Sequence, residues 1–348
     1  FFLSYSCTSM SQERRDSVIN TSDSISCQKD SIITSRLTLL FAGDLMQHQA
    51  QINAARTSTG YDYSDCFKFV KEEINRADIA IANLEVTLGG KPYRGYPAFS
   101  APDEYLFAIR DAGFDVLITA NNHCLDKGKK GLERTLLMLD SLQIPHAGTY
   151  VNTESREQQY PLLLEKNGFR IALLNYTYGT NGIKVISPNV VNYIDKAVMA
   201  QDIEAARAQH PDALIACMHW GDEYQSLPNK EQKNLTDWLL QQGVTHIIGS
   251  HPHVVQPMEL RTDSITGNQH VVVYSLGNFI SNMSARRTDG GLLFKLELEK
   301  DSVTRVANCG YSLVWTSRPV LSRKKNHILY PINYPADSLS VTERNHLK

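Results

Sequence analysis

The fold is decided by the stretch Leu37-Thr38-Leu39-Leu40-Phe41-Ala42-Gly43-Asp44, a short apolar run that ends in a glycine and an acid. An apolar run of this length without polar alternation is typical of a strand buried on both faces, as in a parallel sheet covered by helices. Similar runs recur along the chain, with helical patterns between them. The sequence therefore predicts an α/β fold with a largely parallel core and some antiparallel additions.

Apolar runs like the first one lie downstream at residues 79–82, 116–120, 214–218, 246–248 and 271–274. Amphipathic patterns typical of helices lie at residues 64–76, 103–112, 132–139, 196–209 and 229–242. The dipeptide Asn167-Gly168 separates two further apolar runs and predicts a hairpin across residues 162–174. The alternation of strands and helices extends to about residue 300.

The length of 348 residues favours about two domains, or one large domain with a tail. We predict a signal remnant and flexible linker over residues 1–35, one α/β domain over residues 36–300, and a C-terminal strand with a surface extension over residues 301–348. Lys and Arg total 35 against 37 Asp and Glu, so the net charge is −2. This balance gives no field that would draw the chain onto nucleic acid, and we predict no such partner.

The first seven residues, Phe-Phe-Leu-Ser-Tyr-Ser-Cys, have two interpretations. They are either the end of a signal peptide running into a lipid-modified Cys7, or a ragged N-terminus without regular structure. Residues 8–35 are rich in Ser, Thr, Gln and Asp, and they suit a flexible tether after Cys7. The six cysteines are scattered and form no C-x-x-C pair, so they do not fix the redox compartment.

Several of the predicted strands end in a residue that can bind a metal ion or move a proton. The carboxyl ends of parallel strands lie along one edge of a sheet, so these side chains are expected to converge on one cleft. They are Asp44, Glu85, Asn122, His123, His219, His251 and His253. Their carboxylate, amide and imidazole groups, without thiolates, suit Zn, Mn, Fe or Mg rather than a structural zinc site. Two ions about 4 Å apart would activate a water for an in-line displacement at phosphorus.

Two local motifs carry the sharpest signals. In His251-Pro252-His253, a rigid turn could aim two imidazoles at neighbouring ions, although such a pair also occurs by chance. In Asn121-Asn122-His123, the amide oxygen of Asn122 could bind a metal and leave His123 as a general acid oriented by Asp126. The alternative is an asparagine-rich turn with a solvent-facing histidine.

Other residues have weaker signals. His219 could equally be a hydrogen-bonded core histidine, the commoner fate of a lone histidine. His48 lies four residues after the first acid, where a loop could fold it back onto the site. Glu223 and Asn278 are candidates for groups that support the ligands. Cys124 suggests a nucleophile, but a small packing residue is the favoured interpretation.

The order of these motifs resembles the CapA family of capsule and poly-γ-glutamate synthesis proteins over about residues 36–300. The motifs are Gly43-Asp44, Asn83-Leu84-Glu85, Ala120-Asn121-Asn122-His123, His219-Trp220-Gly221, Gly249-Ser250-His251-Pro252-His253 and Tyr274-Ser275-Leu276-Gly277-Asn278-Phe279. The family is related to the calcineurin-like metallophosphoesterases. The resemblance therefore implies a metallophosphoesterase-like sandwich of two β-sheets flanked by helices.

The resemblance also implies roles for the site residues. A dinuclear site of divalent ions (Mn, Zn or Fe) would be held by six ligands, with His123 as the proton donor. The ligands carried over by motif are Asp44, Glu85, Asn122, His219, His251 and His253. One motif departs from the wider superfamily, in which the first site motif is D-x-H. Here Asp44 has no histidine two residues later, so the first imidazole is either displaced to His48 or absent.

The function implied by the resemblance is metal-dependent hydrolysis of a phosphoester in the cell envelope, linked to capsule or poly-γ-glutamate synthesis. The alternative is a non-catalytic accessory subunit of a synthesis and export complex, and a third interpretation is chemistry on γ-glutamyl amides. The partners would be a phosphoester substrate or an anionic polymer, and a membrane synthase. The protein would be exported, periplasmic or on the surface, and would contact the membrane only through a lipid at Cys7.

Overall fold

The computed structural model describes residues 34–347, so Cys7 and nearly all of the predicted signal remnant and linker lie outside the described residues. Within the described part, no helix is both long enough and apolar enough to cross a membrane.

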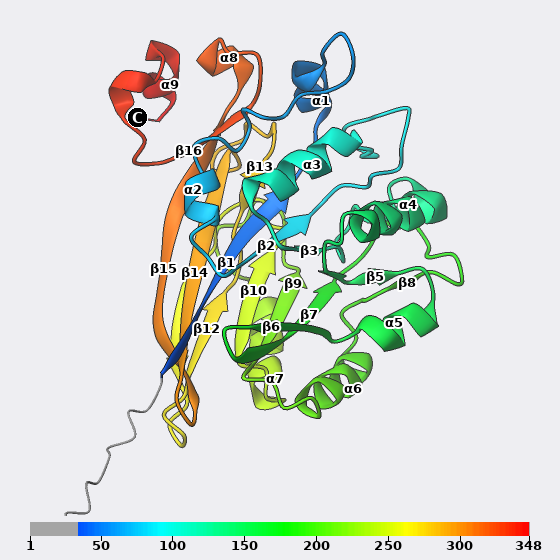
Figure 1. The fold of residues 1–348 in the computed structure, drawn as a ribbon, viewed down its shortest axis with the longest axis vertical. Helices are drawn as coiled ribbons and strands as arrows, with labels where there is room; N and C mark the ends of the chain where they lie inside the picture. Colours follow the sequence, from blue (N-terminus) through cyan, green and yellow to red (C-terminus); the bar gives the residue numbers. More distant parts are fainter. Residues whose placement is uncertain (1–33, 348) are drawn as a thin grey trace, which may run out of the picture. The chain divides into compact units, whose positions relative to one another are not determined.

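Two large β-sheets pack face to face (Figure 1). The first has eight strands in the described residues, in the order β16-β15-β14-β1-β2-β3-β4, with β13 beside β1. Their bounds are β1 Ser35–Leu45, β2 Ile79–Leu84, β3 Val116–Ile118, β4 His146–Ala147, β13 Asn278–Ile280, β14 Gly290–Lys300, β15 Thr304–Ser317 and β16 Ile328–Pro331. Strands β1 to β4 are parallel, whereas β14, β15 and β16 are antiparallel additions.

The second sheet has six strands among the described residues, in the order β11-β12-β10-β9-β7-β6. Their bounds are β6 Leu162–Lys166, β7 Phe169–Thr177, β9 Ala213–His219, β10 His246–Ser250, β11 Met258–Thr262 and β12 Gln269–Val273. The four central strands are parallel, and β6 and β11 pair antiparallel at the edges. A small ladder joins β5 (Thr149–Tyr150) to β8 (Val190–Val191).

Helices cover the outer faces of both sheets (Figure 1). The first sheet carries α2 (Lys71–Ile74), α3 (Asp103–Ala112) and α4 (Gly128–Ser141), and the second carries α6 (Lys196–Arg207) and α7 (Lys230–Gln241). Shorter helices lie in the connections and near the C-terminus: α1 Gln49–Ala55, α5 Thr153–Gln159, α8 Pro319–Ser322, η1 Ala336–Ser338 and α9 Val341–His346. The expected sandwich of two sheets flanked by helices is confirmed.

Strand β1 shows why its sequence is an uninterrupted apolar run. Leu39 and Phe41 point into the core between the sheets, where they join Ile171 and Ile215 of the second sheet. Leu40, on the other face, belongs to the core beneath α3. Because successive side chains alternate between the faces of a strand, a strand covered on both sides needs apolar residues at every position.

Most of the predicted elements are confirmed, and their ends follow local signals. Helix α6 begins after Asp195, whose carboxylate accepts hydrogen bonds from two backbone N–H groups of the first turn. The hairpin between β6 and β7 turns at Asn167 and Gly168, whose φ angles are 52° and 80°. Both angles are positive, as a type I′ turn requires.

The helix predicted over residues 64–76 is much shorter than expected. Only α2 is α-helical, and the residues before it form successive turns. These turns are closed by short-range hydrogen bonds, such as those from the Cys66 N–H to the Tyr63 carbonyl and from the Val70 N–H to the Phe67 carbonyl. All four of these side chains are buried, which indicates that packing overrides the helical pattern.

The C-terminal segment adds an edge strand to the first sheet. Strand β15 lies within the region where a strand is expected, and β16 pairs antiparallel with it. Trp315, Tyr330 and Leu339 form a small apolar cluster of their own. The end of the chain therefore packs onto the sandwich.

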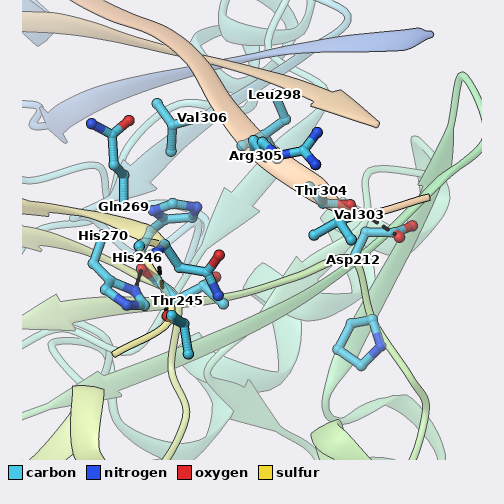
Figure 2. A pocket seen from close by; sticks show the side chains of 14 residues that line it. Asp212, Thr245, His246, Gln269, His270, Leu298, Val303, Thr304, Arg305 and Val306 are labelled. Carbon is cyan, nitrogen blue, oxygen red and sulfur yellow. Dashed lines mark hydrogen bonds between the residues drawn. The ribbon is translucent and has the colours of Figure 1, made fainter. Parts of the chain in front are cut away.

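A cavity of about 470 Å³ opens at the amino ends of β9, β10 and β12 (Figure 2). It is lined by polar side chains that include Asp212, His246, His270 and Arg305. We call it the far-end cavity, because the carboxyl ends of the same strands lie at the opposite end of the sheet.

Candidate metal centre

The carboxyl ends of β1, β9 and β10 bring buried acids and imidazoles together. Asp44 lies near the end of β1, His219 is the last residue of β9, and His251 directly follows β10. Glu85 directly follows β2. Asp44, Glu85 and His219 are each 0% exposed, so this site is inside the molecule rather than on its surface.

The donor atoms fall into two overlapping groups. In each group all the atoms lie within 4.8 Å of one another: Glu85 with His251 and His253, and Asp44 with Glu85 and His219. Glu85 belongs to both groups, with its Oε1 3.9 Å from His219 Nε2 and 4.0 Å from His253 Nε2. Asp44 Oδ2 lies 3.4 Å from His253 Nδ1. This is the arrangement in which one carboxylate can contact two ions.

Asn122 also reaches this cluster. Its Oδ1 lies 2.8 Å from His219 Nε2. All six residues expected as ligands therefore lie in one cluster, although together they span more than 200 positions of the chain.

The charges of the cluster fit a bound cation. Burial, followed by the charge of Asp44, raises the pKa of Glu85 well above its usual value. Among the described residues, only histidines form ion pairs with these two carboxylates. Asp44 Oδ2, Glu85 Oε1 and His251 Nδ1 are buried without a hydrogen-bond partner. Buried polar atoms are normally paired, so the donor set fits divalent metal ions.

Two of the three imidazoles are in the form that a metal needs. In the third, His253, burial acts to lower the pKa, but the neighbouring Asp44 carboxylate raises it above its usual value. Burial, followed by the neighbouring imidazole of His253, lowers the pKa of His251 to about 3. Burial lowers the pKa of His219 well below its ordinary value as well. Both rings are therefore neutral at neutral pH, and a neutral imidazole has a lone pair available for coordination.

Neighbouring groups orient two of these rings. Asn278 donates from Nδ2 to the Thr288 carbonyl at 2.7 Å, so its Oδ1 is the atom that accepts from His253 Nδ1 at 3.0 Å. His219 Nδ1 lies 3.0 Å from Ser250 Oγ. In both histidines Nε2 faces Glu85, while the contact at Nδ1 sets the orientation of the ring, as is usual for histidines that bind metals. His253 Nδ1 also lies near Asp44.

His123 and Asp126 form a buried pair beside the cluster. Asp126 Oδ2 lies 2.8 Å from His123 Nδ1 and also accepts a hydrogen bond from the Phe99 N–H at 2.8 Å. The ring of His123 packs edge-on against Phe99, with centroids 4.7 Å apart. The carboxylate fixes the tautomer with hydrogen on Nδ1, and Nε2 has no hydrogen bond within residues 34–347.

The weaker candidates take other places. His48 Nδ1 accepts from the Asn282 N–H at 3.3 Å. His48 is the N-cap residue of helix α1 and belongs to neither donor group. Glu223 is exposed and belongs to neither donor group. Cys124 is buried among apolar side chains, and burial raises the pKa of its thiol to about 12. That pKa favours the packing role, because a nucleophile must be a thiolate.

Sequence reasoning missed two residues of the site. Asn83 donates from Nδ2 to Asp44 Oδ1 at 2.8 Å and lies 3.3 Å from Glu85 Oε2, so it holds the two carboxylates together. A polar residue inside an apolar strand was the available signal. Tyr178 packs on His251 with ring centroids 4.5 Å apart. No sequence signal distinguished this tyrosine from other loop tyrosines.

The backbone around the site is tightly constrained. His251 and His253 have φ angles of 99° and 59°, a region that residues other than glycine rarely adopt and that is often found at functional sites. Gly43 precedes Asp44, and a Cβ there would lie 1.8 Å from the Gly277 carbonyl oxygen. Only glycine allows the end of β1 to approach that loop so closely.

Comparison with known proteins agrees with this geometry. The family model described as "Bacterial capsule synthesis protein PGA_cap" matches residues 38–283. The capsule biosynthesis protein CapA of Bacillus anthracis is 26% identical over 287 residues, which cover 78% of this chain and 66% of that protein. The PGA biosynthesis protein CapA of Bacillus subtilis (strain 168) is 29% identical over 279 residues, covering 77% and 70%. The chain thus spans about two thirds of the length of these relatives.

Among solved structures, the NAD nucleotidase NadN of Haemophilus influenzae superposes with a TM-score of 0.51 at 13% identity, covering 90% of this chain and 55% of that one. This likeness supports the sandwich of two β-sheets flanked by helices and nothing finer. The family model matches well over half of the chain, and the matched span includes every residue of the two donor groups. The chain therefore belongs to the bacterial capsule synthesis protein PGA_cap family.

Proposed function

We propose that this protein is a metal-dependent phosphoester hydrolase of the cell envelope that acts in capsule or poly-γ-glutamate synthesis. One observation carries the proposal: two fully buried carboxylates, Asp44 and Glu85, face three imidazoles and present orphaned oxygens to the same space. A site of this kind is costly to bury unless it holds cations.

The proposed ligands are the six residues of the cluster, and Glu85 would be shared between two ions because it belongs to both donor groups. Carboxylate, amide and imidazole donors suit Mn, Zn or Fe. Bound ions of this type would supply positive charge to the phosphoryl oxygens and activate the attacking water at neutral pH.

The residues of the chain would supply the proton. As the water oxygen bonds to phosphorus, the bond from phosphorus to the leaving oxygen breaks and leaves negative charge on that oxygen. His123 would donate a proton from Nε2 to it, held in place by the hydrogen bond between its Nδ1 and Asp126. The proton released by the water would restore the imidazolium for the next turnover.

The setting of the reaction is part of the proposal. The two CapA relatives carry capsule and PGA biosynthesis in their names, which supports a role in capsule or PGA synthesis at the envelope. We propose a membrane synthase or export complex as the partner. The protein would be exported, and a lipid on Cys7 would hold it at the membrane.

A second candidate is a non-catalytic accessory subunit that keeps the cleft to bind anionic polymer. The position of His48 favours it, because this residue is the N-cap of α1 and lies outside both donor groups. The end of β1 therefore contributes a single carboxylate to the donor groups, and the loop after it contributes no histidine.

Metal content per chain separates the two candidates. The full chain is purified without chelator and analysed for elements, beside His251→Ala and the matched control His270→Ala, whose imidazole lines the far-end cavity. We expect about two ions per chain, as in dinuclear hydrolases, fewer in His251→Ala and no change in the control. A chain that holds no metal, and takes up none from added Mn or Zn, would contradict the hydrolase and favour the accessory subunit.

A further inference from the structure

A second cavity, of about 550 Å³, lies beside the candidate metal centre. We call it the side cavity. It is lined by residues of the loop that follows β9, by the first turns of α7 and by the start of α6. Its volume lies in the range of small-molecule binding sites.

Tyr178 forms the wall between the side cavity and the metal centre. Its ring packs on His251 with centroids 4.5 Å apart and stacks over His219 at 6.3 Å. The same residue lines the side cavity. Asp222, three residues after His219, lines it too. A substrate whose phosphate lies among the histidines would therefore have the side cavity next to it for the rest of the molecule.

The floor of the side cavity is preorganised. Trp220, Gln232 and Leu235 are buried there. The indole of Trp220 donates to the Tyr274 carbonyl at 2.9 Å, and the amide of Gln232 donates to Gln256 Oε1 at 2.9 Å. Because these polar groups are already paired, the floor offers a fixed surface rather than competing donors.

The charged side chains on the rim indicate which ligand charge the side cavity favours. It carries one cation, Lys196, against two acids, Asp222 and Glu231. The start of α7 is also capped from within, because Asn229 Oδ1 accepts from the Gln232 N–H at 2.9 Å. With an excess of acidic side chains and its helix end capped, the rim disfavours a polyanion such as a glutamate polymer.

We propose that the side cavity binds the sugar ring of a phosphorylated saccharide, with one face of the ring on Tyr178 and hydroxyl groups on Asp222 and Asn234. A sugar ring has an apolar face and a periphery of hydroxyl groups, which matches one exposed aromatic ring surrounded by carboxylates and amides. A nucleobase matches less well, because it presents two flat faces and few hydroxyl groups. The inference rests on the proposed function for the phosphate half of the substrate.

Binding to the metal-free full chain tests the side cavity without relying on hydrolysis. The probes are N-acetylglucosamine, γ-glutamylglutamate and adenosine, each measured by ligand-observed NMR in EDTA. We expect the sugar to bind more tightly than either other probe. We expect its affinity to fall at least tenfold in Asn234→Leu and in Asp222→Ala, and to stay unchanged in Asn268→Leu, which alters an exposed asparagine of the far-end cavity.

Three results would overturn the inference: no sugar binding, tighter binding of adenosine or the dipeptide, or sugar binding that both side-cavity variants retain. Circular dichroism of each variant checks that it is folded. The proposed hydrolase fails separately, because it requires turnover of p-nitrophenyl phosphate by the metal-loaded protein. Turnover of that compound without sugar binding would contradict only the proposal for the side cavity. Sugar binding without turnover would contradict only the proposed hydrolase activity.

Discussion

The two ends of the sandwich contain similar side chains, but these side chains differ in whether they have hydrogen-bond partners. At the far-end cavity (Figure 2), His246 Nδ1 accepts from the Val271 N–H at 3.1 Å, and His270 Nδ1 donates to the Thr245 carbonyl at 2.9 Å. Asp212 pairs with Lys300 at 2.8 Å. Each of these groups has a local partner, so the far end needs no ligand to explain it.

At the metal end the partners are missing. Asp44 Oδ2, Glu85 Oε1 and His251 Nδ1 are buried with no hydrogen bond among the described residues. Histidine and aspartate therefore do not mark a site by their presence alone. What marks it is that buried, unsatisfied carboxylate oxygens and an imidazole nitrogen lie together in one cluster.

The largest effect is expected from Glu85→Gln. Glu85 lies in both donor groups, so its neutral amide should abolish metal retention and reduce phosphoester hydrolysis to background. Metal at 100 times its dissociation constant should raise the free energy of unfolding of the unaltered protein by about 2.7 kcal/mol. The variant should lose this increase, which urea titration with and without Mn²⁺ measures.

The metal-free variant should also resist urea better than the metal-free parent. Burial, followed by repulsion from Asp44, raises the pKa of Glu85, and a neutral amide removes both unfavourable contributions. His270→Ala serves as the control and should keep both metal and activity. A Glu85→Gln variant that retains metal would show that the two ends of the sandwich do not differ as described.

His123→Ala should leave metal content unchanged and lower turnover by about 10²- to 10⁴-fold, the usual contribution of a general acid. The reason is that its imidazole is paired with Asp126 and belongs to neither donor group. Phosphate release from an alkyl phosphoester such as glycerol phosphate, whose leaving oxygen needs a proton, measures this effect in the Mn²⁺-loaded protein. Unchanged turnover would exclude His123 as the proton donor and would say nothing against the metal site.

The sequence was enough to predict the layered fold, because each central strand is buried on both faces and must be apolar throughout. The same reasoning placed His219 and His251 together, since the carboxyl ends of the parallel strands β9 and β10 share an edge. Asp44 comes from the other sheet and meets them across the sandwich. It failed for residues 64–76, where packing of Cys66 and Phe67 overrides the helical pattern.

The side chains that hold the ligands could not be predicted in the same way. Asn83 acts through a contact between segments distant in the chain, because it donates to Asp44, 39 residues away, at 2.8 Å. Asn278, which the sequence did suggest as a supporting group, lies 3.0 Å from His253. The place of His48 depended on a hydrogen bond from Asn282, 234 residues away. Sequence spacing carries no signal for such pairs, because it reports only the neighbours along one strand or helix.

A smaller effect is expected from His246→Asn at the far end. Burial, followed by the charge of His270, lowers the pKa of His246 from 6.5 to about 3 in the folded protein. Between these values the unfolded chain holds one more proton than the folded protein, so stability falls as the pH drops below 6.5.

Asparagine keeps an acceptor for the Val271 N–H but cannot take up a proton. His246→Asn should therefore reduce the pH dependence of the free energy of unfolding by about 1.4 kcal/mol per pH unit between about pH 6 and 4. Urea titrations across that range, in EDTA, measure the difference from the parent. An identical slope in both proteins would contradict a neutral, buried His246.

The smallest effect is expected from Asp212→Asn. The ion pair with Lys300 is partly exposed, with side chains 17% and 32% accessible, so its loss should cost about 0.5–1 kcal/mol of stability. The amide oxygen can still accept from the Arg170 N–H, as the carboxylate does at 2.8 Å. Metal content and turnover should not change, because distant sites without shared partners act independently.

This substitution removes an acid from the far end just as Glu85→Gln removes one from the metal end. A loss of metal in Asp212→Asn would mean that the acids of both ends serve the same site, and the contrast between satisfied and unsatisfied groups would no longer identify the metal centre.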